Sequence, residues 1–308
     1  MTMIAEPAVM VPASRRFIIL ATVSAATMLY AMAITVANVV LPQMRGALSA
    51  TPDQVAWVVT FNLVATAVVT PISGWLSNRF GRRNVMLFCA LGFSISSVLC
   101  GLANSLEALV FYRVLQGAFG APLVPVSQAI ILDTFPKNQH ALATALWGVG
   151  VVFGPIIGPT LGGAIAEEYS WRWVFFMIVP FGLITTGAIW MFIRRRPNRP
   201  KGPSLDWVGF LALAAALAAF QFMFDRGQRN DWFNSSETIV ECTIGFLALY
   251  VFLVHISTAE RPFISLRLFL NRNYSIGLIL AFAFGMLNFT PLVLLPSILQ
   301  DLRGYPDS

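Results

Sequence analysis

The chain has 308 residues, of which 57% are hydrophobic and only 11% are charged. Soluble domains carry about 25% charged residues, so this composition excludes a soluble globular protein and predicts an all-α polytopic membrane protein. Three cysteines and two histidines show no metal-ligand spacing, so we expect no cofactor and no metal. The net charge of +6 follows the membrane topology described below, so we expect no nucleic-acid partner.

Nine apolar stretches are each long enough to cross the roughly 30 Å hydrocarbon core of a bilayer. The connections between them are short, which predicts antiparallel neighbours. The stretches cover residues 17–41, 54–77, 84–103, 106–132, 141–166, 172–193, 205–224, 237–257 and 274–299.

A basic segment with three prolines interrupts this series after the sixth stretch. We expect it to be a cytoplasmic linker at 194–204, between a six-helix bundle at 17–193 and two additional helices at 205–257. Residues 1–16 are expected to form a cytoplasmic N-terminus. Residues 258–308 are expected to form an amphipathic linker and the first helix of an incomplete second half.

The distribution of Lys and Arg predicts the orientation of the chain. With the N-terminus inside, 14 of the 20 basic residues fall in cytoplasmic segments and five in outer segments. Because cytoplasmic loops carry an excess of basic residues, this bias predicts a multi-pass protein of the inner cell membrane with a cytoplasmic N-terminus.

A weak internal repeat supports the incomplete second half. Five identities share one offset of 254 residues, including Leu41-Pro42 with Leu295-Pro296 and Pro52-Asp53 with Pro306-Asp307. Transporters are often built from two duplicated halves, so the ninth stretch is expected to open a second half. Chance or shared turn chemistry is the alternative explanation.

The turn after the second stretch combines two glycines with three arginines. It is either a simple charge cluster that sets topology or a specific motif. The run resembles the G-x-L-a-D-r-x-G-r-k signature of the major facilitator superfamily, whose loop acts as a latch between halves. Asn78 replaces the usual Asp; it lacks the charge but keeps the ability to cap a helix N-terminus. The matching positions are Gly74, Asn78, Arg79, Gly81, Arg82 and Arg83.

The fourth stretch contains Arg113, with Gln116, Gly117 and Gly120 on the same helical face. An arginine inside a span costs several kcal/mol unless it is paired or hydrated, so it indicates a functional residue. The alternative is a structural arginine bonded to carbonyl groups. The run resembles the R-x-x-Q-G motif of the superfamily, whose arginine is associated with proton coupling.

Glycines recur every four residues in the fifth stretch, which predicts a bent helix with a bare face for close packing. The spacing alone fits tight packing as well as a mechanical role. The stretch resembles the antiporter signature G-x-x-x-G-P-x-x-G-G, which implies a hinge surface, and much of the surface that it would move against is expected beyond Ser308. The matching positions are Gly154, Gly158, Pro159, Gly162 and Gly163.

The Trp171-Arg172-Trp173 junction and the two additional helices resemble the fourteen-helix drug:proton antiporter branch of the superfamily (EmrB/QacA type). This resemblance covers nearly the whole chain. It implies a major-facilitator-type helix bundle that is truncated after its ninth helix.

The first stretch resembles the branch pattern D-x-T-x-x-N-V-A-L-P, with Ala33 at the position of the Asp. Glu241 is then the only acidic residue inside an expected span, where a solvated or interfacial position is expected. This chemistry fits a weak-acid or neutral substrate better than a dication. The polar residues expected to line the substrate cavity are Asn38, Asn62, Gln116 and Ser127.

The resemblance implies proton-coupled efflux of amphipathic drugs or related small molecules by alternating access, with the lipid bilayer, protons and the substrate as partners. In two-membrane bacteria it also implies a periplasmic adaptor and an outer-membrane channel. The alternative is a transport-inactive fragment, or half of a split transporter that needs a partner chain. No nucleophile–base pair or phosphate loop is present, so we do not expect an enzyme.

Overall fold

The computed structural model describes residues 12–194, 204–260 and 262–303, with side chains described as far as residue 287. Every regular element in these ranges is helical. Eight helical segments are long and apolar enough to cross a membrane. Most of the expected N-terminus and linker, and the end of the chain, lie outside the described residues. The chain divides into two units, Met1–Val251 and Phe252–Ser308.

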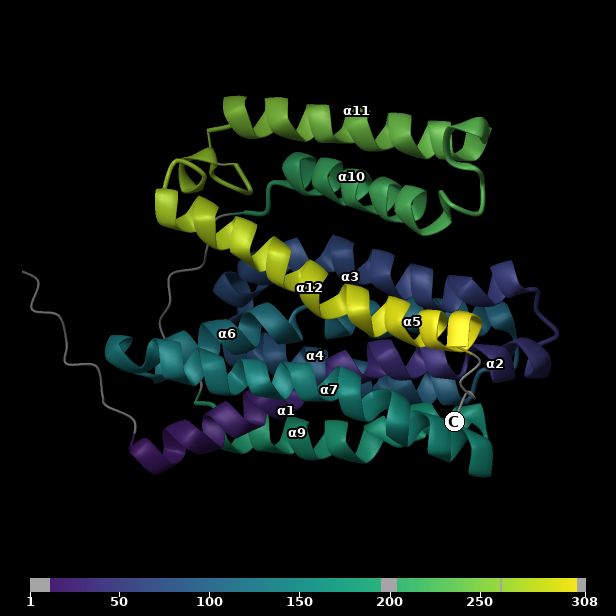
Figure 1. The fold of residues 1–308 in the computed structure, drawn as a ribbon. Helices are drawn as coiled ribbons and strands as arrows, with labels where there is room; N and C mark the ends of the chain where they lie inside the picture. Colours follow the sequence, from purple (N-terminus) through teal and green to yellow (C-terminus); the bar gives the residue numbers. More distant parts are fainter. Residues whose placement is uncertain (1–11, 195–203, 261, 304–308) are drawn as a thin grey trace, which may run out of the picture. The chain divides into compact units, whose positions relative to one another are not determined.

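The first six expected spans coincide with helices of the first unit, as Figure 1 shows. They are α1 (Ala13–Val39), α3 (Pro52–Phe80), α4 (Arg82–Gly101), α5 (Leu106–Gly120) with α6 (Leu123–Thr134), α7 (His140–Glu168), and α8 (Trp171–Phe176) with α9 (Ile178–Phe192).

The remaining expected spans also coincide with helices. They are α10 (Trp207–Arg226), α11 (Ser236–Thr258) and α12 (Arg272–Arg303). The boundary between the two units falls inside α11. Shorter elements lie in the connections: α2 (Leu41–Ala47) and the 3-10 turns η1 (Lys137–Gln139), η2 (Trp232–Asn234) and η3 (Leu266–Leu268).

Prolines break two of the expected spans. Residues 106–132 were expected to form one helix, but α5 ends at Gly120 and α6 begins at Leu123. Proline has no N–H to donate and clashes with the carbonyl four residues earlier, so Pro122 and Pro125 interrupt the helical ladder here. Pro180 does the same between α8 and α9.

The two copies of the internal repeat differ in backbone structure. α1 ends at Val39, and Leu41-Pro42 begins the separate helix α2. By contrast, Leu295-Pro296 lies within α12, which continues to Arg303. Pro306-Asp307 lies outside the described residues. The repeat therefore stays a prediction from the sequence.

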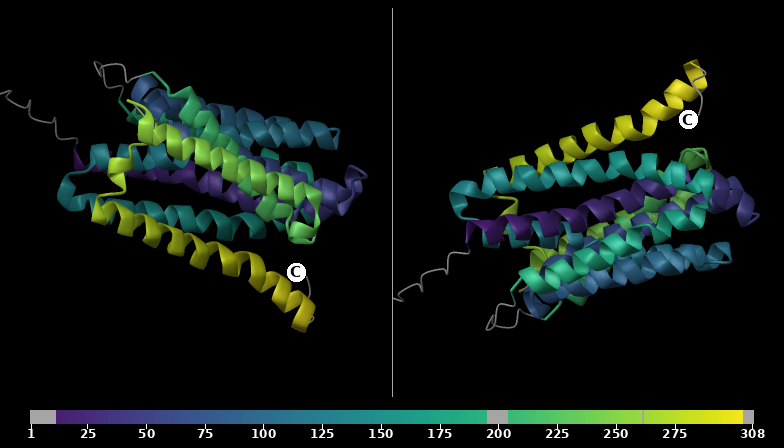
Figure 2. Two further views of the ribbon diagram at one scale, coloured as in Figure 1. Left: turned by 90° about the horizontal axis from the view of Figure 1, so that it is seen from above. Right: turned by 90° about the horizontal axis from the view of Figure 1, so that it is seen from below.

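α1 forms the centre of the first unit. It packs against α6, α7 and α9, and α4 packs against α5 and α9 (Figures 1 and 2). Val23 and Val36 of α1 are completely buried. α3 lies beside α5 and also packs against α10. This arrangement brings polar side chains of α1, α3, α4 and α5 close together inside an apolar bundle.

Candidate functional site

Arg113 is the largest fully buried side chain of the described residues, with 1% of its surface exposed. Its Nε donates to the carbonyl of Val58 on α3 at 3.1 Å. Its Nη1 donates to the carbonyl of Ala33 on α1 at 3.4 Å and to Oε1 of Gln116 on α5 at 2.5 Å. One guanidinium group therefore connects three membrane helices.

Asn62 and Gln116, two of the expected cavity residues, hold Arg113 in place. Gln116 Nε2 donates to Ser97 Oγ on α4 at 2.7 Å. Asn62 Nδ2 donates to the backbone carbonyl of Arg113 at 2.8 Å. Both residues are at most 2% exposed. Their side chains therefore hold Arg113 in position within the packed bundle.

Two glycines of α5 allow this close packing. A Cβ atom at Gly117 would clash with the backbone carbonyl oxygen of Asn62, and one at Gly120 would clash with the ring of Tyr30. Tyr30 in turn forms a hydrogen bond with Thr66 of α3 at 3.1 Å. Larger side chains at either glycine would push α1 or α3 away from α5.

The guanidinium group of Arg113 has a donor edge that is open only in the sense of unpaired, because its Nη2 is buried. Among the described residues its Nη2 has no hydrogen-bond partner, and the ring of Phe175 is centred 5.9 Å from Cζ. Ala33 provides a carbonyl where the resembled pattern has a carboxylate. A buried cation without an acidic partner attracts an anion. The part of the chain that the structure describes contains no cluster of His, Cys, Asp and Glu suited to a metal.

The other two expected cavity residues lie elsewhere. Ser127 is buried on α6, where its Oγ donates to the carbonyl of Val23 at 3.4 Å and lies 3.9 Å from the sulfur of Met86. Asn38 is exposed near the end of α1. Neither forms a hydrogen bond with Arg113, so a cavity role for these two residues stays a prediction.

The glycine face of α7 packs directly on α1. A Cβ atom at Gly154 would lie 2.6 Å from the carbonyl oxygen of Met28, and one at Gly158 would lie 2.8 Å from Thr35 Oγ1. Gly162 meets Val36 in the same way. α1 covers this face, and its role as a hinge surface, with much of the opposing surface beyond Ser308, stays a prediction. Pro159 lies inside the helix, and Gly163 is less crowded than the other three.

The turn between α3 and α4 depends on Gly81, whose φ of +85° is strained for residues with side chains. Asn78 was expected to be able to cap a helix. That expectation is wrong, because Asn78 lies in the last turn of α3 and α4 begins directly after Gly81. Gly74 and Arg79 are also exposed on the last turns of α3.

The last two arginines of the turn fix it to other helices. Arg82 forms an ion pair with Asp133 of α6 and donates to the carbonyl of Ala129 at 2.6 Å. Arg83 donates to the carbonyl of Trp190 on α9 at 2.7 Å. Sequence reasoning missed Asp133 because it lies one residue beyond the expected span 106–132. Its position directly after an apolar run was the available signal.

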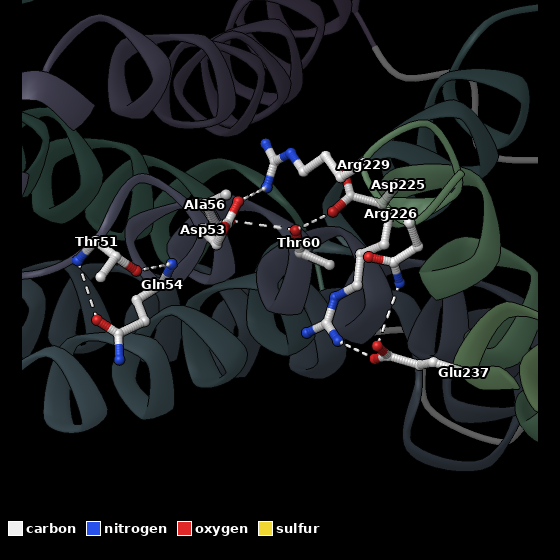
Figure 3. A network of polar contacts seen from close by, with 10 residues as sticks. Thr51, Asp53, Gln54, Ala56, Thr60, Asp225, Arg226, Arg229 and Glu237 are labelled. Atoms are coloured by element: carbon white, nitrogen blue, oxygen red, sulfur yellow. Dashed lines mark hydrogen bonds and ion pairs between the residues drawn. The ribbon is translucent and has the colours of Figure 1, made fainter. Parts of the chain in front are cut away.

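A second polar network joins α10 to the beginning of α3 (Figure 3). The Thr60 hydroxyl, 1% exposed, donates to the Asp225 carboxylate. Arg229 lies 3.6 Å from Asp53, and Arg226 pairs with Glu237 of α11 at 2.7 Å. Sequence reasoning missed Asp225 because the expected span ended one residue before it.

Comparisons with known proteins show which protein family this chain belongs to. The profile of the Major Facilitator Superfamily matches residues 23–308. The chain is 37% identical over 282 residues to the Multidrug export protein EmrB of Escherichia coli (strain K12), covering 92% of this chain and 55% of EmrB. It is also 37% identical over 271 residues to the Fatty acid resistance protein FarB of Neisseria gonorrhoeae, covering 88% and 54%. The chain thus spans about half the length of these relatives.

A solved structure agrees on the fold. The crystal structure of a bacterial homologue of the human lysosomal transporter Spinster superposes with a TM-score of 0.55 at 22% identity, over 80% of this chain and 62% of that chain. The expected bundle and the resemblance to drug:proton antiporters are therefore confirmed. The roles of individual residues are not tested by these similarities.

Proposed function

Because the chain belongs to the major facilitator superfamily, we propose that it forms part of an exporter that exchanges protons for an amphipathic small molecule by alternating access. Two observations support this proposal. The relatives it matches include a multidrug export protein. The bundle also buries a charged residue, Arg113, at the junction of three helices.

Arg113 carries the proposal. Arginine stays protonated in proteins, so it does not release the coupled proton itself. It favours the ionised form of an acid that approaches its open Nη2 edge, and it thereby promotes proton release from that acid. The acid is either part of the substrate or a side chain from spans that pair with this bundle.

The missing carboxylate at Ala33 favours a weak acid as substrate. A cationic compound would face the uncompensated charge of Arg113, whereas a carboxylate would pair with it. The name of one relative, Fatty acid resistance protein, points to the same substrate class.

Vesicles that contain the transport-competent protein, with the 308-residue chain as part of it, test the substrate class. An imposed proton gradient is expected to drive movement of a fluorescent fatty acid and not of a dicationic dye, and Arg113→Gln is expected to abolish the movement. Transport of the dication with the fatty acid ignored would overturn the substrate proposal.

The alternative proposal is that the 308 residues transport only together with a partner chain. The chain spans about half the length of the relatives it matches. Fatty-acid movement that requires co-expression of a second half-transporter would support the alternative, and movement by the 308-residue chain alone would exclude it.

We also propose an inner-membrane location with a cytoplasmic N-terminus. The positive-inside distribution of Lys and Arg supports this orientation. A periplasmic adaptor and an outer-membrane channel belong to the same proposal, on the resemblance to the drug-export branch. Co-purification from a two-membrane bacterium would test these partners.

A further inference from the structure

A groove runs between α4 and α9, away from the residues that bond to Arg113. Its volume of about 550 Å³ lies in the range of small-molecule sites, roughly 300–1,000 Å³. Its walls are mainly apolar, and Phe88 and Trp190 on its sides are 67% and 66% exposed. The lining residues are Asn84, Leu87, Phe88 and Leu91 of α4, with Thr186, Gly187 and Trp190 of α9.

Arg83 is not among the lining residues, but it adjoins the end of the groove that Asn84 and Trp190 form. Arg83 lies in the first turn of α4, beside Asn84, and its Nη2 donates to the carbonyl of Trp190 across the groove. Its Nε is buried and has no partner among the described residues. The N-terminal turn of a helix adds unpaired backbone N–H groups and a partial positive charge. The groove thus has an apolar body and an end suited to an anion.

We propose that this groove binds one anionic phospholipid, with the lipid phosphate at Arg83 and one acyl chain along α4 and α9. The proposal follows from the charge and the environment. The walls belong to membrane-spanning helices, so hydrocarbon chains surround them, and the guanidinium fork of arginine matches the geometry of a phosphate group. Basic pockets between membrane helices are suited to anionic head groups.

Gly187 keeps the body of the groove open. No atom lies within 4 Å of the position that a Cβ would occupy there. A leucine at this position would therefore extend into the groove from a Cβ that meets no other atom, and leucine favours helix more than glycine does. Gly187→Leu is therefore expected to block the groove while the protein keeps its fold.

Binding of phosphatidylglycerol and phosphatidylcholine to the delipidated, purified chain tests the proposal, measured by native mass spectrometry. The wild type is expected to bind one phosphatidylglycerol more tightly than phosphatidylcholine. Arg83→Gln is expected to weaken phosphatidylglycerol binding about tenfold, because a hydrogen bond to a charged group is lost, and to remove the preference over phosphatidylcholine, whose choline cation neutralises its own phosphate. Gly187→Leu is expected to weaken the binding of both lipids.

Two variants serve as matched controls. Arg194→Gln removes an exposed arginine that follows α9 and does not line the groove, and Gly148→Leu adds a side chain to α7 at another open glycine. Neither variant is expected to change the affinity for the one tightly bound phosphatidylglycerol. Equal affinity for both lipids, wild-type binding by Arg83→Gln or Gly187→Leu, or dimerisation through this face in place of lipid binding would each overturn the proposal.

Discussion

At Arg113, desolvation and hydrogen bonding have opposite effects on the free energy of burying the guanidinium group. Burying an arginine in a membrane bundle costs several kcal/mol. Its bonds to two carbonyls and to Gln116 offset this cost, since hydrogen bonds to charged groups each contribute about 1.5–3 kcal/mol. Because Nη2 has no partner among the described residues, these bonds do not offset the whole desolvation cost. An anion that reaches Nη2 would therefore be bound favourably.

Ala33 determines whether the Nη2 edge stays open. Ala33→Asp places a carboxylate on the residue whose carbonyl already accepts from Arg113. We expect it to pair with the guanidinium, to reduce fatty-acid transport and to permit transport of a cation. Transport of both substrate classes in vesicles measures this change.

Ala26→Asp is the matched control, because Ala26 is also 2% exposed and lies two turns earlier on α1. An unpaired buried carboxylate there is expected to lower the unfolding temperature much more than Ala33→Asp does. Equal destabilisation by both substitutions would show that Asp at position 33 does not pair with Arg113.

The sequence predicted only part of this site. Arg113 and Gln116 are three residues apart on one helix, so their common face follows from helical periodicity. The bond from Asn62 to the Arg113 carbonyl joins residues 51 positions apart, and the Arg82–Asp133 pair joins residues from different helices. Such contacts depend on how the helices pack, which local pattern does not specify.

At the scale of elements, the packing of α7 on α1 depends on missing side chains. Gly158→Leu would place atoms against Thr35 Oγ1 and the backbone carbonyl of Met32, at 2.8 and 3.0 Å from the new Cβ. We expect a loss of about 1–3 kcal/mol in stability, as for other overpacked cores. Thermal unfolding in detergent measures it.

Gly148→Leu on the same helix is the control, because no atom lies within 4 Å of its Cβ position. It is expected to unfold at the wild-type temperature or slightly above. Equal stability of Gly158→Leu and Gly148→Leu would contradict the close contact between α7 and α1.

The additional helix α10 is attached to α3 by a buried polar contact. Asp225→Ala leaves the buried hydroxyl of Thr60 without this acceptor, and we expect α10 to separate from α3 more often. The ring centroids of Phe61 and Phe222 are 5.3 Å apart, so cysteines that replace these two residues report how close the helices are. We expect Asp225→Ala to lower the rate at which these cysteines form a disulfide.

Arg229→Ala is expected to leave this cross-linking rate unchanged. Its ion pair with Asp53 is 3.6 Å long, and the two side chains are 49% and 79% exposed. Such surface pairs contribute about 0–1 kcal/mol. A larger effect from Arg229→Ala than from Asp225→Ala would contradict this assignment.

Helix positions were the most predictable feature at this scale. Length and hydropathy alone located the first eight spans, because each helix must satisfy its own backbone in lipid. The breaks after Gly120 and Phe176 were not expected. Prolines are present in α3 and α7 as well, where the helix continues. Whether a proline breaks a membrane helix depends on neighbouring helices that satisfy the freed carbonyls.

At the scale of the whole molecule, the proposed orientation makes a direct prediction. Single cysteines at two exposed loop positions, Asn104 and Asn138, should lie on opposite sides of the membrane. A membrane-impermeant maleimide added to intact cells is expected to label position 104 and not position 138. The reverse pattern would place the N-terminus outside and contradict the positive-inside interpretation.

The central claim is that Arg113 couples proton release to export. The most direct measurement is the pH dependence of fatty-acid transport in proteoliposomes of the transport-competent protein, compared between the wild type and Arg113→Lys. Lysine keeps the charge but lacks the rigid fork through which Nε and Nη1 of Arg113 donate to Val58, Ala33 and Gln116. We predict a rate about tenfold lower and a shifted pH dependence. A folded Arg113→Lys protein with an unchanged rate and pH profile would contradict the account.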